Sequence, residues 1–74
     1  MADPKLLFGQ RLIQLRKHLG WSQERLALES GIARSYLGGV ERGQRNIALV
    51  NIHKLAEALS VPPSSLLEPP SIND

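Results

Sequence analysis

The amino-acid sequence predicts an all-α fold: a compact five-helix domain that spans residues 1–74. Three observations support this prediction. Apolar residues recur at helical spacing along most of the chain, Gly and Pro separate these stretches at intervals of a helix length, and no stretch alternates apolar and polar residues as a strand does. With 74 residues, 42% of them hydrophobic and 22% charged, the chain has the size and composition of one small globular domain.

The first helix is expected from about Pro4 to Leu19. Asp3 can cap its N-terminus, and proline is favoured at the first helical position. Gly20 supplies the C-terminal stop. The inner face of this helix carries four apolar residues at helical spacing: Phe8, Leu12, Leu15 and Leu19.

Two short helices follow, over residues 23–30 and 33–42. Ser22 can cap the first of them, and Gly31 and Gly43 can end the two helices. Ala33 stands where a capping side chain would be expected in the second, which costs about 1 kcal/mol. The residues predicted to face inward are Leu26, Ala27, Leu37 and Val40.

The last two helices are expected at 49–59 and just after Pro62-Pro63. Ala48 again offers no capping side chain. The final short turn of helix carries Leu66 and Leu67 and ends at Pro69-Pro70. The apolar face of the longer helix consists of Ile52, Leu55, Ala56 and Leu59.

The spacing of residues 22–42 is that of a helix-turn-helix. Gly31 reaches a positive φ easily, and Ile32 can fill the angle between the two helices. This geometry presents the start of the second helix outward, where it can enter a DNA major groove. The side chains there are Arg34, Ser35 and Tyr36, and arginine makes the bidentate contact that specifies guanine. Such helix pairs also occur in ordinary helical bundles, so the geometry alone does not distinguish a DNA-binding domain from such a bundle.

The charge distribution favours a polyanionic partner. Residues 5–45 hold eight cations against three carboxylates, a net charge of +5, whereas residues 46–74 have a net charge of −2. A basic part followed by an acidic part suggests one face for a polyanion and a separate face for another contact.

The same residues carry a family resemblance. The blocks concerned are Trp21-Ser22-Gln23-Glu24-x-Leu26-Ala27, Ser30-Gly31-Ile32, Tyr36-Leu37-x-x-Val40-Glu41-Arg42-Gly43, Leu55-Ala56-x-x-Leu59-x-Val61 and Leu66-Leu67. Together they resemble the Cro/phage-repressor (XRE-type) helix-turn-helix family over nearly the whole chain. Residues 34–46 are similar to the controller proteins of restriction–modification systems, which are small dimeric regulators without an effector domain.

This resemblance implies a sequence-specific, double-stranded DNA-binding transcriptional regulator that acts as a homodimer on a palindromic operator. It implies an internal ion pair between Arg16 and Glu41, and a dimerisation part at about 47–70. The implied base-reading positions are Arg34, Ser35, Tyr36 and Gly39. The implied phosphate and backbone contacts are Gln23, Arg42, Gln44, Arg45 and Asn46. The candidate dimer contacts are Ile47, Val50, Leu66 and Leu67.

The sequence departs from the family pattern inside the recognition helix. Gly38 and Gly39 each cost about 1 kcal/mol relative to alanine in a helix interior. Relatives often carry a base-reading side chain at the position of Gly39, which has none here. Base reading is therefore expected from the first turn of the helix, or from close backbone approach and DNA shape.

Other chemistry finds little support in the sequence. The absence of cysteine excludes disulfides and thiolate metal sites, and His18 and His53 lack the spacing of metal ligands. The glycines at 38, 39 and 43 lack the Lys-Ser/Thr and the preceding strand of a phosphate loop. We expect no enzyme, no metal, no cofactor and no small-molecule ligand.

The longest apolar run has four residues, and the N-terminus lacks the apolar region of a secretory signal. We therefore expect no membrane partner and a cytoplasmic location, in a bacterium or encoded by a phage and associated with the nucleoid. RNA polymerase would be a further partner if the protein activates transcription. The alternatives are a phage-type repressor, an antitoxin of the same fold, and a protein-interaction module whose basic face binds an acidic partner.

Overall fold

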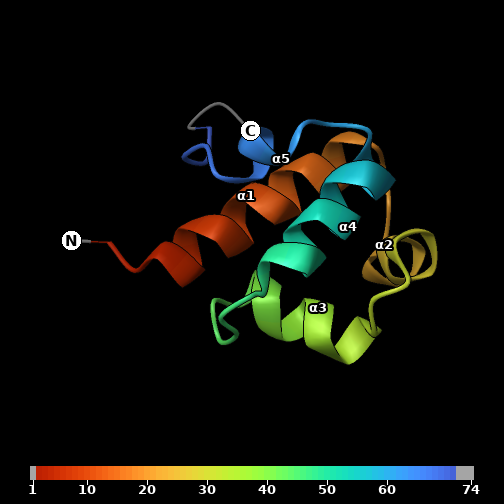
Figure 1. Cartoon of the computed structure of the whole chain (residues 1–74), viewed down its shortest axis with the longest axis horizontal. Coiled ribbons are helices and arrows are strands. Elements are labelled where there is room, and N and C mark those ends of the chain that lie inside the picture. The colour runs from red at the N-terminus through yellow and green to blue at the C-terminus, as the bar shows by residue number, and fades with distance from the viewer. Residues whose placement is uncertain (1, 72–74) are drawn as a thin grey trace.

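The computed structural model describes residues 2–71, and within them the chain forms helices and no strand, as predicted. Figure 1 shows α3 along one edge of the molecule and α5 at the opposite edge, with α1 and α4 between them. The helices are α1 (Pro4–His18), α2 (Gln23–Ser30), α3 (Arg34–Glu41), α4 (Leu49–Leu59) and α5 (Pro63–Leu66). The predicted five-helix, all-α fold is confirmed.

The bounds of α2 and α4 are those predicted, whereas α1 ends at His18 rather than Leu19 and α3 covers residues 34–41 rather than 33–42. Leu67, expected in the last helix, lies just past the end of α5. Asp3 accepts a hydrogen bond from the backbone N–H of Lys5, and Ser22 accepts one from that of Arg25. Gly31 ends α2 with φ +73°, in the left-handed region that favours glycine. Helices α3 and α4 begin without a side-chain cap, as the alanines at positions 33 and 48 predict.

The core lies where α1, α3 and α4 meet the short helices. Its buried apolar residues are Phe8, Leu12, Leu26, Ile32, Leu37, Val40, Leu55, Ala56, Leu59 and Leu66. The prediction that Leu19 lies on the inner face of the first helix is wrong, because 42% of its surface is exposed. Since α1 ends at His18 and the chain turns at Gly20, Leu19 lies past the last inward-facing turn.

The adjacent leucines at the end of α5, its last residue Leu66 and the capping residue Leu67, have opposite environments. Leu66 is fully buried, whereas Leu67 is 68% exposed. Successive residues of a helical turn point about 100° apart, so one of an adjacent pair faces the core and the other faces solvent. The expectation that Leu66 contacts a partner subunit is therefore wrong, because its side chain is already part of the core.

Gly9 brings α1 into direct contact with the end of α3. A Cβ atom built on Gly9 would lie 2.5 Å from the carbonyl oxygen of Val40 and 2.6 Å from that of Glu41. Both neighbours are backbone atoms, so they cannot rotate out of the way. The sequence signal for this contact was only an unexplained glycine in the middle of an apolar stripe.

We predict that Gly9→Ala destabilises the protein by about 1–3 kcal/mol, because the added methyl overfills this contact. Alanine is intrinsically better than glycine in a helix by about 1 kcal/mol, so only a tertiary clash can produce this sign. Denaturant unfolding measures it. Gln10→Ala, at the exposed neighbouring position, should change the free energy of unfolding by less than about 0.5 kcal/mol. A Gly9→Ala variant as stable as the parent would contradict the close approach of α1 and α3.

Candidate nucleic-acid interface

Helices α2 and α3 form a helix-turn-helix. Gly31 starts the turn with its positive φ, and its backbone N–H donates to the carbonyl of Ala27 at 2.9 Å. Ile32 is buried in the core, where it fixes the angle between the two helices. Trp21, just before α2, packs against the core, and the guanidinium of Arg25 lies 4.8 Å from the centre of its ring.

The first turn of α3 presents its side chains to solvent. Arg34 and Ser35 are exposed and Tyr36 is half-buried, whereas residues 37–41 are buried. The loop after α3 adds a second polar set, all of it exposed: Arg42, Gln44, Arg45 and Asn46. The residues predicted to read bases and those predicted to contact the DNA backbone thus lie on or next to the same helix.

Two guanidinium groups meet over Gly38. A Cβ atom on Gly38 would lie 3.1 Å from Nη1 of Arg42 and 3.9 Å from Nη1 of Arg34. Arg42 is also held by Gln44, whose Oε1 accepts a hydrogen bond from Arg42 Nε at 3.1 Å. Helix propensity marked Gly38 only as a weak point of the helix, but its missing side chain leaves room for two cations on the surface of α3.

A polar network connects this surface to the interior. Arg16 donates from Nε and Nη2 to the two carboxylate oxygens of Glu41, at 2.7 and 3.0 Å, and from Nη1 to the carbonyl of Trp21 at 2.7 Å. The side chains of Arg16 and Glu41 are only 11% and 3% exposed. Gln23 donates from Nε2 to Glu41 at 2.7 Å, and its Oε1 accepts from Nη1 of Arg34 at 2.6 Å.

The order of donors and acceptors in this network is determined by chemistry. The carboxylate of Glu41 bound to Arg16 can only accept hydrogen bonds, so Gln23 must present its NH₂ group to it. The carbonyl oxygen of Gln23 then faces outward, where only a donor such as Arg34 can satisfy it. Gln23 therefore links the buried ion pair to the first cation of α3.

Other kinds of site are not apparent among the described residues. No three His, Asp or Glu side chains between residues 2 and 71 gather as metal ligands would. Over the same range, the longest helix has 15 residues, and none has both the length and the apolarity of a membrane span.

Comparison with known proteins places the chain in a family. The sequence profile of the helix-turn-helix family matches residues 12–66, which is more than half of the chain. The chain belongs to the XRE-type helix-turn-helix family. The matched stretch of this helix-turn-helix protein contains the whole network from Arg16 to Glu41, and the resemblance expected from its residues is confirmed.

Several relatives of this helix-turn-helix protein have names that refer to control of transcription or of restriction–modification. It is 46% identical over 65 residues to control protein C.BamHI of Bacillus amyloliquefaciens, covering 86% of this chain and 80% of the relative. The crystal structure of the restriction–modification controller protein C.AhdI from Aeromonas hydrophila has a TM-score of 0.85 and 58% identity, covering 88% of this chain and 98% of that one.

A hypothetical transcription factor from Neisseria, called NHTF, has a TM-score of 0.87 and 44% identity, covering 92% of this chain and 78% of that one. The helix-turn-helix protein is therefore a DNA-binding transcriptional regulator, similar to restriction–modification controller proteins.

We predict that Glu41→Ala costs about 3–5 kcal/mol of unfolding free energy, because it leaves the buried guanidinium of Arg16 without its counter-charge. A matched control is Glu29→Ala, which removes a carboxylate from an exposed ion pair with Arg25 on α2. That variant should lose about 0–1 kcal/mol. Thermal or denaturant unfolding of both variants measures the difference, and equal losses would show that burial of the Arg16 pair adds nothing.

Proposed function

We propose that this protein is a controller protein of a restriction–modification system, which acts in the cytoplasm and binds a palindromic operator as a homodimer. Each subunit would read one half-site through α3, with the half-sites about 34 Å apart on one face of the DNA. The observation that carries this proposal is the gathering of three guanidinium groups, those of Arg34, Arg42 and Arg45, over the outward side of α3 at Gly38 and Gly39. The names of the relatives C.BamHI and C.AhdI support it.

The charge balance of this surface favours a polyanion. Like charges that lie close together repel, and phosphates relieve the repulsion when they bind. Glu41 does not offset these cations, because its carboxylate is buried and paired with Arg16. Glu24 Oε2 lies 3.8 Å from Nε of Arg34, and most of its side chain is exposed. Replacing this ion pair by a contact to DNA costs only about 0–1 kcal/mol.

Within this surface, we propose that Arg34, Ser35 and the hydroxyl of Tyr36 contact bases. Arg34 presents its fork of donors at the start of α3, the part of a recognition helix that enters the major groove. Contacts to phosphate and sugar are proposed for the residues that surround this first turn: Gln23, Arg42, Gln44 and Asn46. Such contacts position the helix and carry no sequence information of their own.

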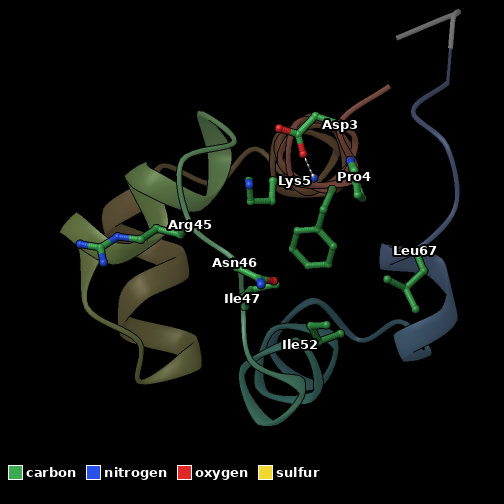
Figure 2. A pocket seen from close by; sticks show the side chains of 9 residues that line it. Asp3, Pro4, Lys5, Arg45, Asn46, Ile47, Ile52 and Leu67 are labelled. Atoms are coloured by element: carbon green, nitrogen blue, oxygen red, sulfur yellow. Dashed lines mark hydrogen bonds between the residues drawn. The ribbon is translucent and has the colours of Figure 1, made fainter. Parts of the chain in front are cut away.

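A separate apolar face is proposed as the dimer interface. Leu49, Val50 and Leu67 are 69%, 65% and 68% exposed. Leu49 and Ile52 are three residues apart on α4 and share a face, and Ile52 lines an open cavity of about 360 Å³ together with Leu67. Ile47 also lines this cavity while packing partly against the core (Figure 2).

The proposed apolar face therefore consists of Leu49, Ile52 and Leu67, with Ile47 at its edge. Val50 is exposed next to Leu49 but points about 100° away from it, so it is proposed as a contact at the margin of this face. Clustered exposed apolar side chains on so small a domain are typical of an association surface. A second copy of the chain fits this face best, because a palindromic site requires a two-fold dimer. Leu49 replaces Leu66 in the set of contacts predicted from the sequence.

We predict that Leu67→Asp yields a folded monomer at micromolar concentration, because it places a charge in the proposed interface. Leu66→Asp should instead unfold the chain, since position 66 is fully buried in the core. Analytical ultracentrifugation gives the mass of each variant and circular dichroism gives its helicity. A Leu67→Asp variant that remains dimeric would place the interface elsewhere.

We predict that Arg34→Ala lowers affinity for the selected operator by about 1–3 kcal/mol and relaxes the preference at one base pair per half-site. Lys54→Ala is a matched control, because it removes an exposed cation from α4 beside Glu57, away from α3. The measurement is affinity for single-base-pair variants of a duplex selected by the protein. Equal loss on every variant would make Arg34 a phosphate contact only.

The salt dependence of the parent protein tests DNA binding itself. Several phosphate contacts predict a steep fall of log affinity with log salt concentration, with a slope of about −0.9 per contact. A protein-interaction module that binds an acidic protein would show no affinity for duplex DNA of any sequence at physiological salt.

A further inference from the structure

Arg45 occupies the space that a side chain at position 39 would fill. A Cβ atom built on Gly39 would lie 2.9 Å from Cγ of Arg45, 3.4 Å from its Nε and 3.7 Å from its Cδ. The aliphatic part of Arg45 therefore lies directly on the backbone of α3. In a recognition helix, position 39 is where a base-reading side chain would be attached, and here a side chain from the following loop takes that place.

Tyr36 supports Arg45 from one turn earlier. Residues 36 and 39 are three apart, so they lie on the same face of α3. The guanidinium carbon of Arg45 is 5.6 Å from the centre of the Tyr36 ring, within the range of a cation–π contact. Because the Tyr36 ring packs against the core, it forms a firm surface under the cation rather than a mobile one.

The loop that carries Arg45 is itself tied to α3. The backbone N–H of Gln44 donates to the carbonyl of Gly39 at 2.8 Å, and that of Gly43 donates to Val40 at 3.0 Å. Gly43 has φ +75°, which turns the chain back along the helix. Arg45 thus follows directly after a residue that is anchored on Gly39.

Figure 2 shows the direction in which the Arg45 side chain extends. Ile47, Ile52 and Leu67 line the cavity, and Arg45 lies at its edge. The end of the Arg45 side chain extends away from these apolar residues, over α2 and α3. Arg45 is exposed, and within residues 2–71 its guanidinium forms no hydrogen bond or ion pair that a new partner would have to replace.

We propose that Arg45 is a specificity-determining residue that reads a base edge from the position of the missing side chain at 39. Tyr36 acts as the positioning residue, and Gly39 is required because any side chain there would displace Arg45. The guanidinium offers the donor pair that matches O6 and N7 of guanine, at a base pair next to the one read by Arg34. This rests on the proposed DNA-binding function, and it replaces the expectation that Arg45 contacts only the backbone.

The test begins with sites that the parent protein selects from random duplexes of about 30 base pairs, long enough for two half-sites. Affinity is then measured for every single-base-pair variant of the selected site. Arg45→Ala should bind the selected site about 5- to 150-fold more weakly and lose discrimination at one base pair per half-site, a different one from that lost in Arg34→Ala. Arg42→Ala, the matched control, should weaken binding to all variants alike.

Gly39→Ala tests whether the Arg45 side chain must lie across position 39 of α3 to reach a base. It should lose the same base-pair discrimination as Arg45→Ala while remaining folded with a melting temperature near that of the parent, because the higher helix propensity of alanine offsets the lost packing of Arg45. Tyr36→Phe keeps the ring and should retain discrimination at the base pair assigned to Arg45, whereas Tyr36→Leu should lose it.

Four results would overturn the proposal. Equal loss on all variants for Arg45→Ala would make it a phosphate contact, and parental discrimination in Gly39→Ala would exclude the route across position 39. Loss of discrimination that is the same in Tyr36→Phe and Tyr36→Leu would exclude the ring as its support. A parent that selects no sequence would overturn the proposed function as well, which separates that failure from the others.

Discussion

The buried ion pair of Arg16 and Glu41 is the interaction on which the DNA-binding surface depends. It joins α1 to the last residue of α3, and the Trp21 carbonyl and the Gln23 amide complete its hydrogen bonds. Charges this deep in a protein require such partners, since an unpaired one costs several kcal/mol. The same bonds hold the start of α2 against the end of α3. The outward oxygen of Gln23 then holds Arg34, so the interior determines where the first cation of the recognition helix lies.

Three glycines inside helices, Gly9, Gly38 and Gly39, allow neighbouring segments to pack closely against α3. Gly9 lets α1 reach the carbonyls at the end of α3, where Glu41 meets Arg16. Gly38 and Gly39 leave the surface of α3 open, and arginines from its first turn and from the following loop lie across it. Each of these glycines weakens its helix by about 1 kcal/mol. This cost has a structural reason at every one of the three positions, because a methyl group would meet backbone or displace a cation.

Much of the fold follows from the sequence. Ser22 and Gly31 predict the bounds of α2, the apolar spacing predicts those of α4, and Pro62-Pro63 predict the start of α5. The turn at Gly31-Ile32 predicts the helix-turn-helix. The spacing could not tell which of two adjacent leucines faces the core, because that depends on how α5 sits against α1 and α4. Nor could it show the direction of Arg45, since a long side chain in a loop has no periodicity. The partners of Gln23 are equally invisible in the sequence, because Arg34 and Glu41 lie at opposite ends of another helix, α3.

The central claim is that the buried ion pair serves to position the recognition helix more than to stabilise the fold. The double variant Arg16→Met, Glu41→Leu tests this most directly, since apolar residues of similar size often replace a buried ion pair without loss of stability. We expect the double variant to melt near the parent temperature and still to bind duplex DNA. Its affinities for single-base-pair variants of the selected site should no longer distinguish the base pair assigned to Arg34, because Gln23 has lost its acceptor. Parental discrimination at that base pair in a folded double variant would contradict the account.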